Sequence, residues 1–205
     1  MEQVKIRLQN ISKSYYSETA VTQALRKINL EFSMGEFVAI TGESGSGKST
    51  LLNIIGGMDT FDEGEMFVDG EPTFQYDDQD WEAFRRNKIG YIFQDYSLVG
   101  HYTALDNVMS ALLILGVDKK DARETAMKYL AQVGLAGYET HRASELSSGQ
   151  KQRLSIARAL AKNTEIIVAD EPTGNLDSET GNQIIQLLKE LSKDKLVIMV
   201  THNYD

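Results

Sequence analysis

A glycine-rich segment that joins a short apolar stretch to a helix-like stretch constrains this chain more than any other feature. Residues 42–49 read Gly-Glu-Ser-Gly-Ser-Gly-Lys-Ser and match the phosphate-loop pattern G-x-x-x-x-G-K-[ST]. The preceding residues, 37–41, form an unbroken apolar strand pattern, and residues 48–55 are predicted to form a helix. A strand that turns through glycines into a helix places backbone N–H groups and a helix N-terminus around a phosphate.

This loop assigns chemistry to particular side chains. Lys48 is expected to reach the β- and γ-phosphates of a nucleotide, and the Ser49 hydroxyl to ligate Mg²⁺. The alternative is a glycine-rich turn with a solvated lysine, but a lysine in a first helical turn is unfavourable unless an anion lies there. The predicted nucleotide contacts of this segment are Gly42, Glu43, Ser44, Gly45, Ser46, Gly47, Lys48, Ser49 and Thr50.

The rest of the chain alternates strand-like and helix-like stretches. Val4, Ile6 and Leu8 alternate with polar residues, as in a half-buried strand. Further strands are predicted at 37–41, 89–93, 166–169 and 196–200, and helical stretches at 48–55, 103–133, 148–162 and 178–191. Apolar strands that alternate with helices favour a buried parallel sheet. The helical block near 98–145 interrupts this alternation, and we interpret it as a subdomain inserted into an α/β core.

Polar side chains follow three of the later strands. They are Gln94, the pair Asp170 and Glu171, and His202. Because ligands bind beyond the carboxyl ends of parallel strands, we expect these residues near the phosphate loop. An acid at the end of a buried strand is unfavourable unless a cation pairs with it. We therefore predict that Asp170 holds Mg²⁺ and that Glu171 orients and deprotonates the attacking water.

Each of these residues also has a plainer interpretation when it is taken alone. Gln94 or His202 could be an ordinary polar residue at a strand end. Asp170 and Glu171 could be turn acids before Pro172. Because the chain also contains a phosphate loop, all of the plain interpretations would have to hold at once. We therefore favour a shared site for these residues.

A second helix start also favours an anion. Leu146–Gln150 precedes a helix that opens with Lys151 and Arg153, and residues 150–164 contain no acid. This breaks the usual preference for acids in a first turn. The helix could bind its own phosphate or complete a site on another copy of the protein. The alternative is a serine-capped helix with a basic, solvated face.

Composition excludes several classes of protein. The chain has 30 acidic and 21 basic residues, a net charge of −9, which disfavours nonspecific nucleic-acid binding. It has no cysteine, which excludes disulfides and thiolate metal sites. Apolar runs such as Leu196–Val200 are too short to span a membrane, and the first residues lack a signal-peptide pattern. We expect a cytoplasmic protein that reaches a membrane only through a partner.

Over nearly its whole length the sequence resembles the nucleotide-binding domain of ATP-binding cassette (ABC) ATPases. Leu146–Gln150, LSSGQ, resembles the signature motif LSGGQ, and Asn175–Asp177 resembles the D-loop. Gln94 is similar to the Q-loop glutamine and His202 to the switch histidine. Tyr15 resembles the aromatic residue that stacks on adenine. Tyr16 is the alternative there, and either tyrosine could simply be an aromatic on a strand face.

The resemblance implies the cofactors ATP and Mg²⁺ and a head-to-tail homodimer, or a paired ABC subunit. ATP would lie between the phosphate loop of one copy and the signature of the other. Further nucleotide contacts would then come from Tyr15, Ser147, Ser148, Gly149, Gln150 and Asp177. The implied catalytic residues are Glu171, His202, Lys48 and Gln94, and the implied metal ligands are Ser49, Gln94 and Asp170.

The resemblance also implies the fold and the setting. The fold is α/β: a P-loop NTPase core with a parallel sheet, an N-terminal antiparallel β subdomain and an inserted α-helical subdomain. One domain would occupy 1–205, with the core at about 1–97 and 146–205, the helical subdomain at about 98–145 and further C-terminal elements lacking. A membrane-spanning subunit or a fused membrane domain would hold the chain at the cytoplasmic face of the membrane, docking around Gln94–Asn107. Nucleic acid is not an expected partner.

The segments Ile89–Gln94, His101–Val108 and Thr173–Asp177 resemble one subgroup of this family. It includes the ATPases of macrolide exporters, lipoprotein-releasing complexes and antimicrobial-peptide resistance transporters, and the FtsE cell-division protein. The implied function is ATP-driven export or extraction, and the alternative is an ATP-dependent regulatory or scaffolding module. Three residues depart from the family pattern: Ser148 replaces a signature glycine, Ala143 replaces a proline common before the signature, and Glu43 replaces a proline common in the phosphate loop.

Two further classes fit less well. ABC proteins of DNA repair or translation carry coiled coils or tandem cassettes, and this chain has neither. A phosphate-loop kinase would not account for the signature segment or for Glu171 beside Asp170.

Overall fold

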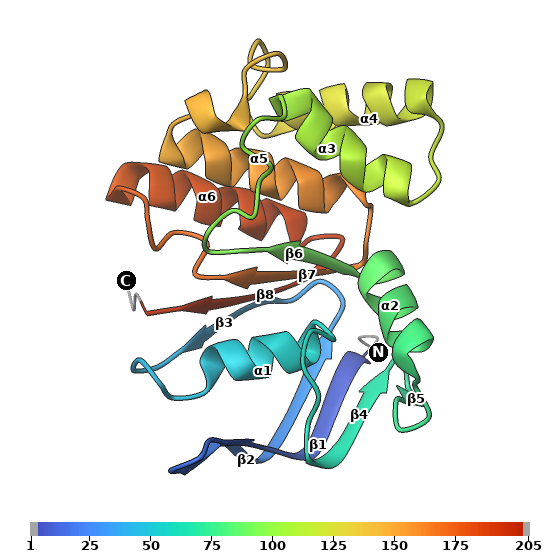
Figure 1. Ribbon diagram of the computed structural model, residues 1–205, viewed down its shortest axis with the longest axis vertical. Helices are drawn as coiled ribbons and strands as arrows, with labels where there is room; N and C mark the ends of the chain where they lie inside the picture. The colour runs from blue at the N-terminus through green and yellow to red at the C-terminus, as the bar shows by residue number, and fades with distance from the viewer. Residues whose placement is uncertain (1–3, 203–205) are drawn as a thin grey trace.

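The computed structural model describes residues 4–202 and contains two four-stranded sheets. Residues 1–3 and 203–205 lie outside the described residues. The first of these segments belongs to the N-terminal stretch in which we expect no signal peptide. Figure 1 shows a layer of helices on one side of the parallel sheet, with helix α1 (Lys48–Ile55) on its other side, facing the antiparallel sheet. Within the described residues, no helix is both long and apolar enough to cross a membrane.

The N-terminal sheet is antiparallel and has the strand order β2-β1-β4-β5. Its strands are β1 (Val4–Tyr16), β2 (Val21–Ser33), β4 (Glu63–Val68) and β5 (Glu71–Pro72). Apolar residues alternate along the start of β1, and those that are buried pack with α1 in one core. The predicted antiparallel β subdomain is therefore confirmed.

The second sheet is parallel and has the strand order β3-β8-β7-β6. Its strands are β3 (Phe37–Thr41), β6 (Ile89–Ile92), β7 (Ile166–Asp170) and β8 (Leu196–Thr201). All four strands predicted for the parallel sheet are present, so their carboxyl ends share one edge. The sheet is not uniformly buried: β8 is buried throughout, whereas β3 lies at the sheet edge and is half-buried to exposed.

Alternate residues of the parallel strands enter two different cores. On β7, Ile166 and Val168 join the core shared with α1 and the antiparallel sheet, whereas Ile167 and Ala169 join the core under the helical layer. Because successive side chains of a strand point to opposite faces, a strand covered on both faces must be apolar without interruption. This explains why the apolar runs identified β7 and β8.

The helical layer contains α3 (Ala104–Ile114), α4 (Lys119–Gln132), α5 (Ser148–Ala161) and α6 (Ser178–Leu191). A 3₁₀ turn at Ala143–Glu145 precedes α5. Buried residues of α5 belong to one apolar core with α3, α4 and the parallel sheet. The helical subdomain at about 98–145 thus adjoins α5 without a break in the core, and its boundaries remain a prediction.

Two helical features differ from the sequence expectations. The predicted helical stretch 103–133 is two helices, because Gly116 has a φ of +81° and Asp118 caps a new helix through the backbone N–H of Lys120. Helix α2 (Asp78–Asn87) was not predicted, although Asp77 and Asp80 form a capping box at its start. Its only fully buried residue is Phe84, which leaves a weak apolar pattern.

Four alternating charges connect the two sheets at the edge opposite the phosphate loop. Lys5 Nζ lies 2.7 Å from Asp69 Oδ1 and 3.1 Å from Glu165 Oε2. Lys88 Nζ lies 3.0 Å from Asp69 Oδ2 and 3.2 Å from Glu165 Oε2. Burial alone would raise the pKa of Asp69, but its hydrogen bonds from Lys5 and Lys88 outweigh this effect, so the pKa is lowered. The ionised cluster therefore stabilises the contact between β1 and the parallel sheet.

We expect Asp69→Asn to lower the free energy of unfolding by about 1.5 kcal/mol at neutral pH, because Lys5 is nearly buried and loses a charged partner. Ionised Asp69 stabilises the fold above its ordinary pKa of 3.8, and this contribution is lost as pH falls through the lowered folded value. Urea denaturation should therefore show the difference at neutral pH and none well below pH 3.8. The control Glu31→Gln breaks the exposed pair with Arg7 and should change stability by less than about 0.5 kcal/mol. A difference that persists in acid would contradict the pKa argument.

Candidate active site

The phosphate loop ends in an uncapped helix. Gly47 is the N-cap residue of α1, and no side chain caps the first turn, which also contains no acid. Gly47 has a φ of +90°, and a Cβ at this position would lie 2.4 Å from the carbonyl oxygen of Ala24 on β2. The loop is thus packed tightly on the antiparallel sheet while its helix start keeps backbone N–H groups free for an anion.

The Lys48 ammonium is held by the loop itself. Its Nζ donates to the carbonyl oxygens of Gly42, at 2.9 Å, and Glu43, at 2.7 Å. Lys48 is buried, and it forms no ion pair with a carboxylate of residues 4–202. Its other partner is the Ser46 hydroxyl at 3.5 Å. A buried cation with only neutral oxygen partners lacks a counterion, and a phosphate would supply one.

Ser49 and Asp170 meet at the end of β7, as the predicted metal site requires. Ser49 Oγ donates to Asp170 Oδ1 at 3.3 Å. Burial raises the pKa of Asp170, although the Ser49 hydrogen bond and the charges of His202 and Lys48 oppose it. Gln94 lines a cavity of about 480 Å³ together with Asp170. A hydroxyl, a carboxylate and an amide are oxygen donors of the kind that Mg²⁺ takes, so these three residues fit the ion.

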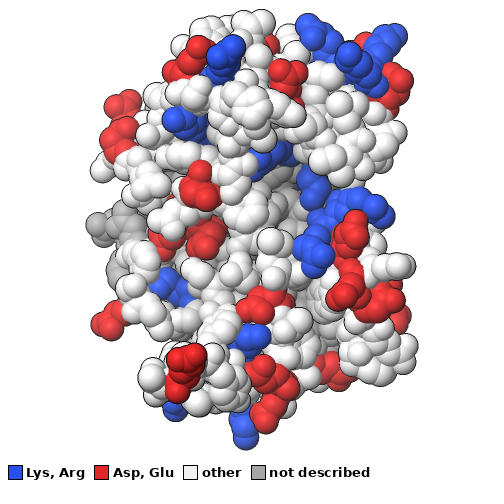
Figure 2. Space-filling view, in the orientation of Figure 1, with Lys and Arg blue, Asp and Glu red and all other residues white. Residues whose placement is uncertain are grey.

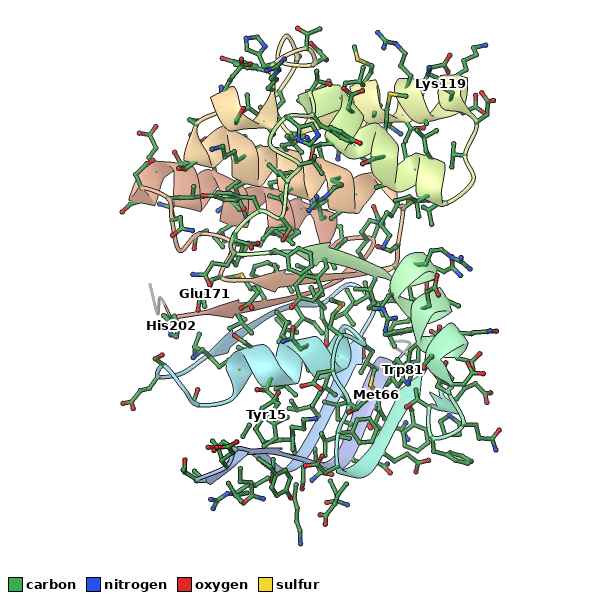
Figure 3. The ribbon with its side chains drawn as sticks, in the orientation of Figure 1. Tyr15, Met66, Trp81, Lys119, Glu171 and His202 are labelled. Carbon is green, nitrogen blue, oxygen red and sulfur yellow. The ribbon has the colours of Figure 1, made fainter. Side chains whose placement is uncertain are left out.

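Glu171 and His202 lie together beyond the ends of β7 and β8 (Figure 3). The backbone N–H of His202 donates to Glu171 Oε2 at 3.3 Å, and His202 Nε2 lies 3.1 Å from Glu171 Oε1. Both residues line a cavity of about 370 Å³ that also contains Gln94. Glu171 has a φ of +47°, which is unfavourable for a residue with a side chain, and its N–H is tied to the carbonyl of Val200 at 3.0 Å. The fold thus holds this carboxylate at the cavity in a strained backbone conformation.

Tyr15, rather than Tyr16, lies beside the phosphate-loop helix. The Tyr15 hydroxyl donates to Asp59 Oδ2 at 2.6 Å and lies 3.4 Å from Thr50 Oγ1 of α1. Tyr16 is 77% exposed. Burial and the hydrogen bond to Asp59 raise the pKa of Tyr15. No sequence pattern indicated Asp59, which reaches Tyr15 from a loop 44 residues later in the chain.

The segment Leu146–Gln150 forms a self-capped helix start. Ser147 Oγ accepts from the N–H of Gln150 at 3.3 Å, and Gln150 Oε1 accepts from the N–H of Ser147 at 3.0 Å. Ser147 and Ser148 are exposed, and the first turn of α5 contains no acid. The serine cap that the plainer interpretation of this helix start assumed is therefore present, and both serines are exposed.

The start of α5 packs against the start of α6, next to the segment compared with the D-loop. A Cβ on Gly149 would lie 2.7 Å from Thr180 Cγ2, so any side chain at this position would force Thr180 or the helix start to shift. Asp177 caps α6 by accepting from the N–H of Thr180 at 2.9 Å. The described contacts include none between 146–150 and the phosphate loop. The single chain thus holds two separate groups of predicted nucleotide contacts.

Arg158 is a residue of α5 that the sequence patterns did not single out. Its guanidinium donates to the carbonyls of Tyr96 and Ser97. These two residues have φ values of +66° and +46° and come shortly after Gln94. Arg158 therefore holds a strained loop that carries Gln94. The acid-free stretch 150–164 was the available signal, since it leaves this cation without a helical counterion.

Comparison with known proteins identifies related chains. A family model described as "ABC transporter" matches residues 25–174. The Methanocaldococcus jannaschii "Uncharacterized ABC transporter ATP-binding protein MJ0796" is 45% identical over 204 residues, which are 97% of this chain and 87% of that protein. The "Lipoprotein-releasing system ATP-binding protein LolD" of Geobacter metallireducens is 41% identical, over 97% of this chain and 89% of its own length.

Two further matches concern a longer protein and a solved structure. The "Macrolide export ATP-binding/permease protein MacB" of Vibrio parahaemolyticus is 41% identical over 99% of this chain, which spans only 31% of that protein. A dimeric structure of a post-hydrolysis state of the cassette MJ0796, bound to ADP and Pi, matches with a TM-score of 0.87 and 42% identity. It covers 97% of this chain and 88% of that one.

Glycine at 47 should be far less replaceable than glycine at 45, although both have positive φ. Gly45→Ala adds only backbone strain, about 1 kcal/mol, because nothing lies within 4 Å of the new Cβ. Gly47→Ala adds the contact with the Ala24 carbonyl, so we expect a loss of about 3 kcal/mol. Urea denaturation of the two variants measures the difference. Equal losses would show that the packing of the loop on β2 does not matter for stability.

Proposed function

Because the chain belongs to the ABC transporter family, we propose that it binds and hydrolyses ATP as the motor subunit of a membrane transporter. The observation that carries this proposal is the gathering of Lys48, Asp170 and Glu171 at one edge of the parallel sheet. The separation of the signature segment from that edge within one chain further supports a site completed by a second copy.

The phosphate loop binds the triphosphate. The free N–H groups at the start of α1 point toward the β- and γ-phosphates, and Lys48 exchanges its carbonyl partners for phosphate oxygens. Ser49, Gln94 and Asp170 hold Mg²⁺. The ion, when bound, neutralises charge on the phosphate oxygens. Tyr15 offers its ring to the adenine from beside Thr50.

Glu171 serves as the general base. Its carboxylate accepts a proton from the water that attacks the γ-phosphorus, while the backbone N–H of His202 fixes one carboxylate oxygen. The His202 ring lies between the other oxygen and the carbonyl of Gly42, at 3.4 Å, so it joins the base to the phosphate loop. Gln94 lines the same cavity, where it orients the water.

Two copies of the chain assemble head to tail. The phosphate loop of one copy then faces the exposed Ser147 and Ser148 of the other. The uncapped start of α1 and the start of α5, neither of which has an acid in its first turn, converge on one ATP. Asp177 lies beside this signature segment and helps to complete the site. The dimeric, ADP- and Pi-bound structure of MJ0796 supports assembly into a nucleotide-bound dimer.

A membrane-spanning partner, separate or fused, completes the transporter. MacB is named as an ATP-binding and permease protein, and LolD as the ATP-binding protein of a releasing system. The partner docks on the cytoplasmic side at the segment Gln94–Asn107. Asn107 orders this segment, because its side chain bonds both the N–H and the carbonyl of Val99, at 2.9 and 3.1 Å.

Replacing the base should stop hydrolysis without removing ATP binding. We expect Glu171→Gln to lower turnover by about a hundredfold or more and to accumulate a closed, ATP-bound dimer. Steady-state ATPase assays and sedimentation velocity measure the two effects. The control Glu190→Gln changes an exposed glutamate of α6 and should leave both unchanged. Turnover at the wild-type rate in Glu171→Gln would remove Glu171 from the role of base.

Mixing inactive chains should restore activity if the site is shared between copies. Lys48→Ala and Ser147→Ala should each impair hydrolysis, and Ser147→Ala should still bind nucleotide as a monomer. A dimer of one chain of each kind places both defects in one site and leaves the other site intact. A chain carrying both substitutions, paired with the wild type, gives a mixed dimer with no intact site. Both mixed dimers are purified away from homodimers, through different tags on their two chains, before the assay. Equal ATPase rates of the two mixed dimers would contradict the shared site.

A further inference from the structure

Tyr15 is anchored through its hydroxyl group. The hydroxyl donates to Asp59 Oδ2 at 2.6 Å and lies 3.4 Å from Thr50 Oγ1. The residue is nevertheless 42% exposed. Because the hydroxyl already has polar partners within the chain, the ring is the part of this side chain that is left for a ligand. In Figure 3, Tyr15 lies beside α1, the helix that follows the phosphate loop.

Asp59 is a charged acceptor that three donors surround. Besides the Tyr15 hydroxyl, its carboxylate accepts from the backbone N–H of Thr60 at 2.7 Å and from Lys13 Nζ at 3.2 Å. Burial alone would raise the pKa of Asp59, but these three hydrogen bonds outweigh burial, so the pKa is lowered. The hydrogen bond from Tyr15 to Asp59 is therefore charge-assisted, which is the stronger class of hydrogen bond.

Lys13 limits which face of the Tyr15 ring a base can use. Its Nζ lies over this ring, 5.3 Å from the ring centroid. Lys13 is itself buried and has Asp59 as its counterion. A cation thus occupies one face of the ring, so a base has to stack on the opposite face.

Charge does not account for how a base would be held here, because adenine is neutral. Figure 2 shows basic side chains gathered between the helical layer and α2, whereas acidic and basic side chains are interspersed around α1. The face shown therefore has no basic patch near Tyr15 and α1. The anchored ring is the feature of this region that suits a flat, neutral base.

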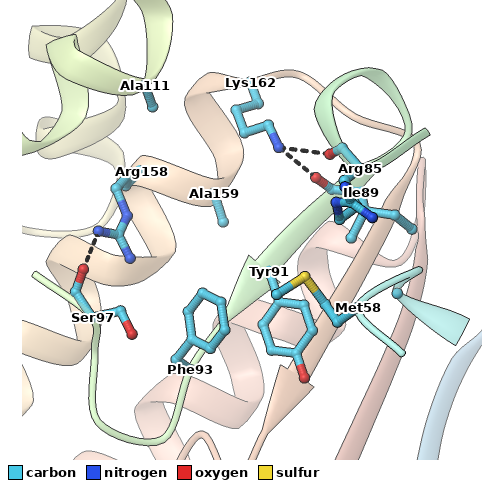
Figure 4. A pocket seen from close by; sticks show the side chains of 11 residues that line it. Met58, Arg85, Ile89, Tyr91, Phe93, Ser97, Ala111, Arg158, Ala159 and Lys162 are labelled. Carbon is cyan, nitrogen blue, oxygen red and sulfur yellow. Dashed lines mark hydrogen bonds between the residues drawn. The ribbon is translucent and has the colours of Figure 1, made fainter. Parts of the chain in front are cut away.

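The loop that carries Asp59 is fixed in place. The N–H groups of Met58 and Asp59 donate to the carbonyl of Asn53 in α1, at 2.8 and 3.3 Å. The carbonyl of Gly57 accepts from Arg85 of α2 at 2.7 Å. Met58 lines a groove beside β6 and α5 (Figure 4), whereas the next residue, Asp59, reaches β1. The carboxylate therefore has a defined position from which to hold the ring.

We propose that Asp59 is a positioning residue for the nucleotide base: it holds the Tyr15 ring in the orientation in which the ring stacks on adenine. The inference rests on the proposed function, in which Tyr15 contacts the base, and it adds the residue that prepares this contact. A mobile ring would lose rotational freedom when a base stacks on it. Because the hydrogen bond to Asp59 immobilises the ring before the nucleotide binds, binding does not bear that loss.

Calorimetric titration with ADP tests the inference and requires no hydrolysis. Tyr15→Phe keeps the ring and removes only the hydroxyl, and we expect it to weaken ADP binding about fivefold. It should leave the affinity for inorganic pyrophosphate, measured by competition against ADP, unchanged, because pyrophosphate has no base. The control Tyr16→Phe removes the hydroxyl of the neighbouring tyrosine, which is exposed, and should change neither affinity.

Asp59→Asn gives an effect whose sign is diagnostic. This change removes a negative charge near an anionic ligand, so electrostatics alone predicts tighter ADP binding. The inference predicts binding that is about threefold weaker, because the hydrogen bond left to Tyr15 is a neutral one. In a Tyr15→Phe chain, which has no hydroxyl to hold, Asp59→Asn should weaken ADP binding no further.

Fluorescence of Trp81, the single tryptophan, checks that Asp59→Asn keeps the loop in place. The Trp81 ring lies 3.1 Å from the Cβ position of Gly57, two residues before Asp59. An emission spectrum like that of the wild type is expected. A shifted spectrum together with weaker binding in the Tyr15→Phe background would assign Asp59 to the structure of the loop and overturn the inference.

Tighter or unchanged ADP binding in Asp59→Asn would also overturn the inference. So would an equal loss of ADP and pyrophosphate affinity in Tyr15→Phe, which would assign the hydroxyl to the structure of the phosphate-loop helix. ATPase assays on the same samples separate the two proposals. Hydrolysis by the wild type with unweakened ADP binding in Tyr15→Phe rejects only the inference. Weaker ADP binding in Tyr15→Phe without hydrolysis by the wild type rejects only the proposed hydrolysis.

Discussion

The hydrogen-bond ladder of the parallel sheet is the constraint on which the site depends. Thr41 pairs with Thr201, Asp170 with Val200, and Ile92 with Ala169, so the strands β3, β8, β7 and β6 end close together, with a small stagger, at one edge of the sheet. A parallel ladder sends every carboxyl end to one edge, whatever the distance along the chain. As a result His202 lies 3.4 Å from the carbonyl of Gly42, a residue 160 positions earlier.

Helix α5 is the second constraint, because it connects three parts of the structure around the candidate site. Its first turn carries the signature segment, Arg158 in its second half holds the loop after Gln94, and Lys162 just beyond its end holds the carbonyl of Ile89 at the start of β6. Its buried face belongs to the same core as α3, α4 and the parallel sheet. Because packed helices move as rigid units, a shift of α5 would move its signature end and the Gln94 loop together.

Local sequence patterns predicted those helices and strands that carry one strong signal, such as an unbroken apolar run or a glycine-rich loop. The strands β7 and β8 are buried on both faces, so their sequences are unbroken apolar runs. The glycine pattern at 42–47 located the phosphate loop and the start of α1. Where the signal was weak or mixed, prediction failed: α2 buries little, and the interruption at Gly116 was hidden by apolar residues on either side. The half-buried state of β3 could not be read from its sequence, because it depends on the place of that strand at the sheet edge.

The sequence by itself determined which residue types stand at the strand ends and helix starts, because strand and helix periodicity are local properties of the chain. It therefore indicated Lys48, Ser49, Asp170 and Glu171 before any coordinates. Only the tertiary structure decided which of them meet, and at what distance. It also decided that Asp59 reaches Tyr15 and that Arg158 holds the loop after Gln94. These contacts join residues that are far apart in the chain. Which residues meet depends on how the two apolar cores pack on the two faces of the parallel sheet, and no local pattern encodes that packing.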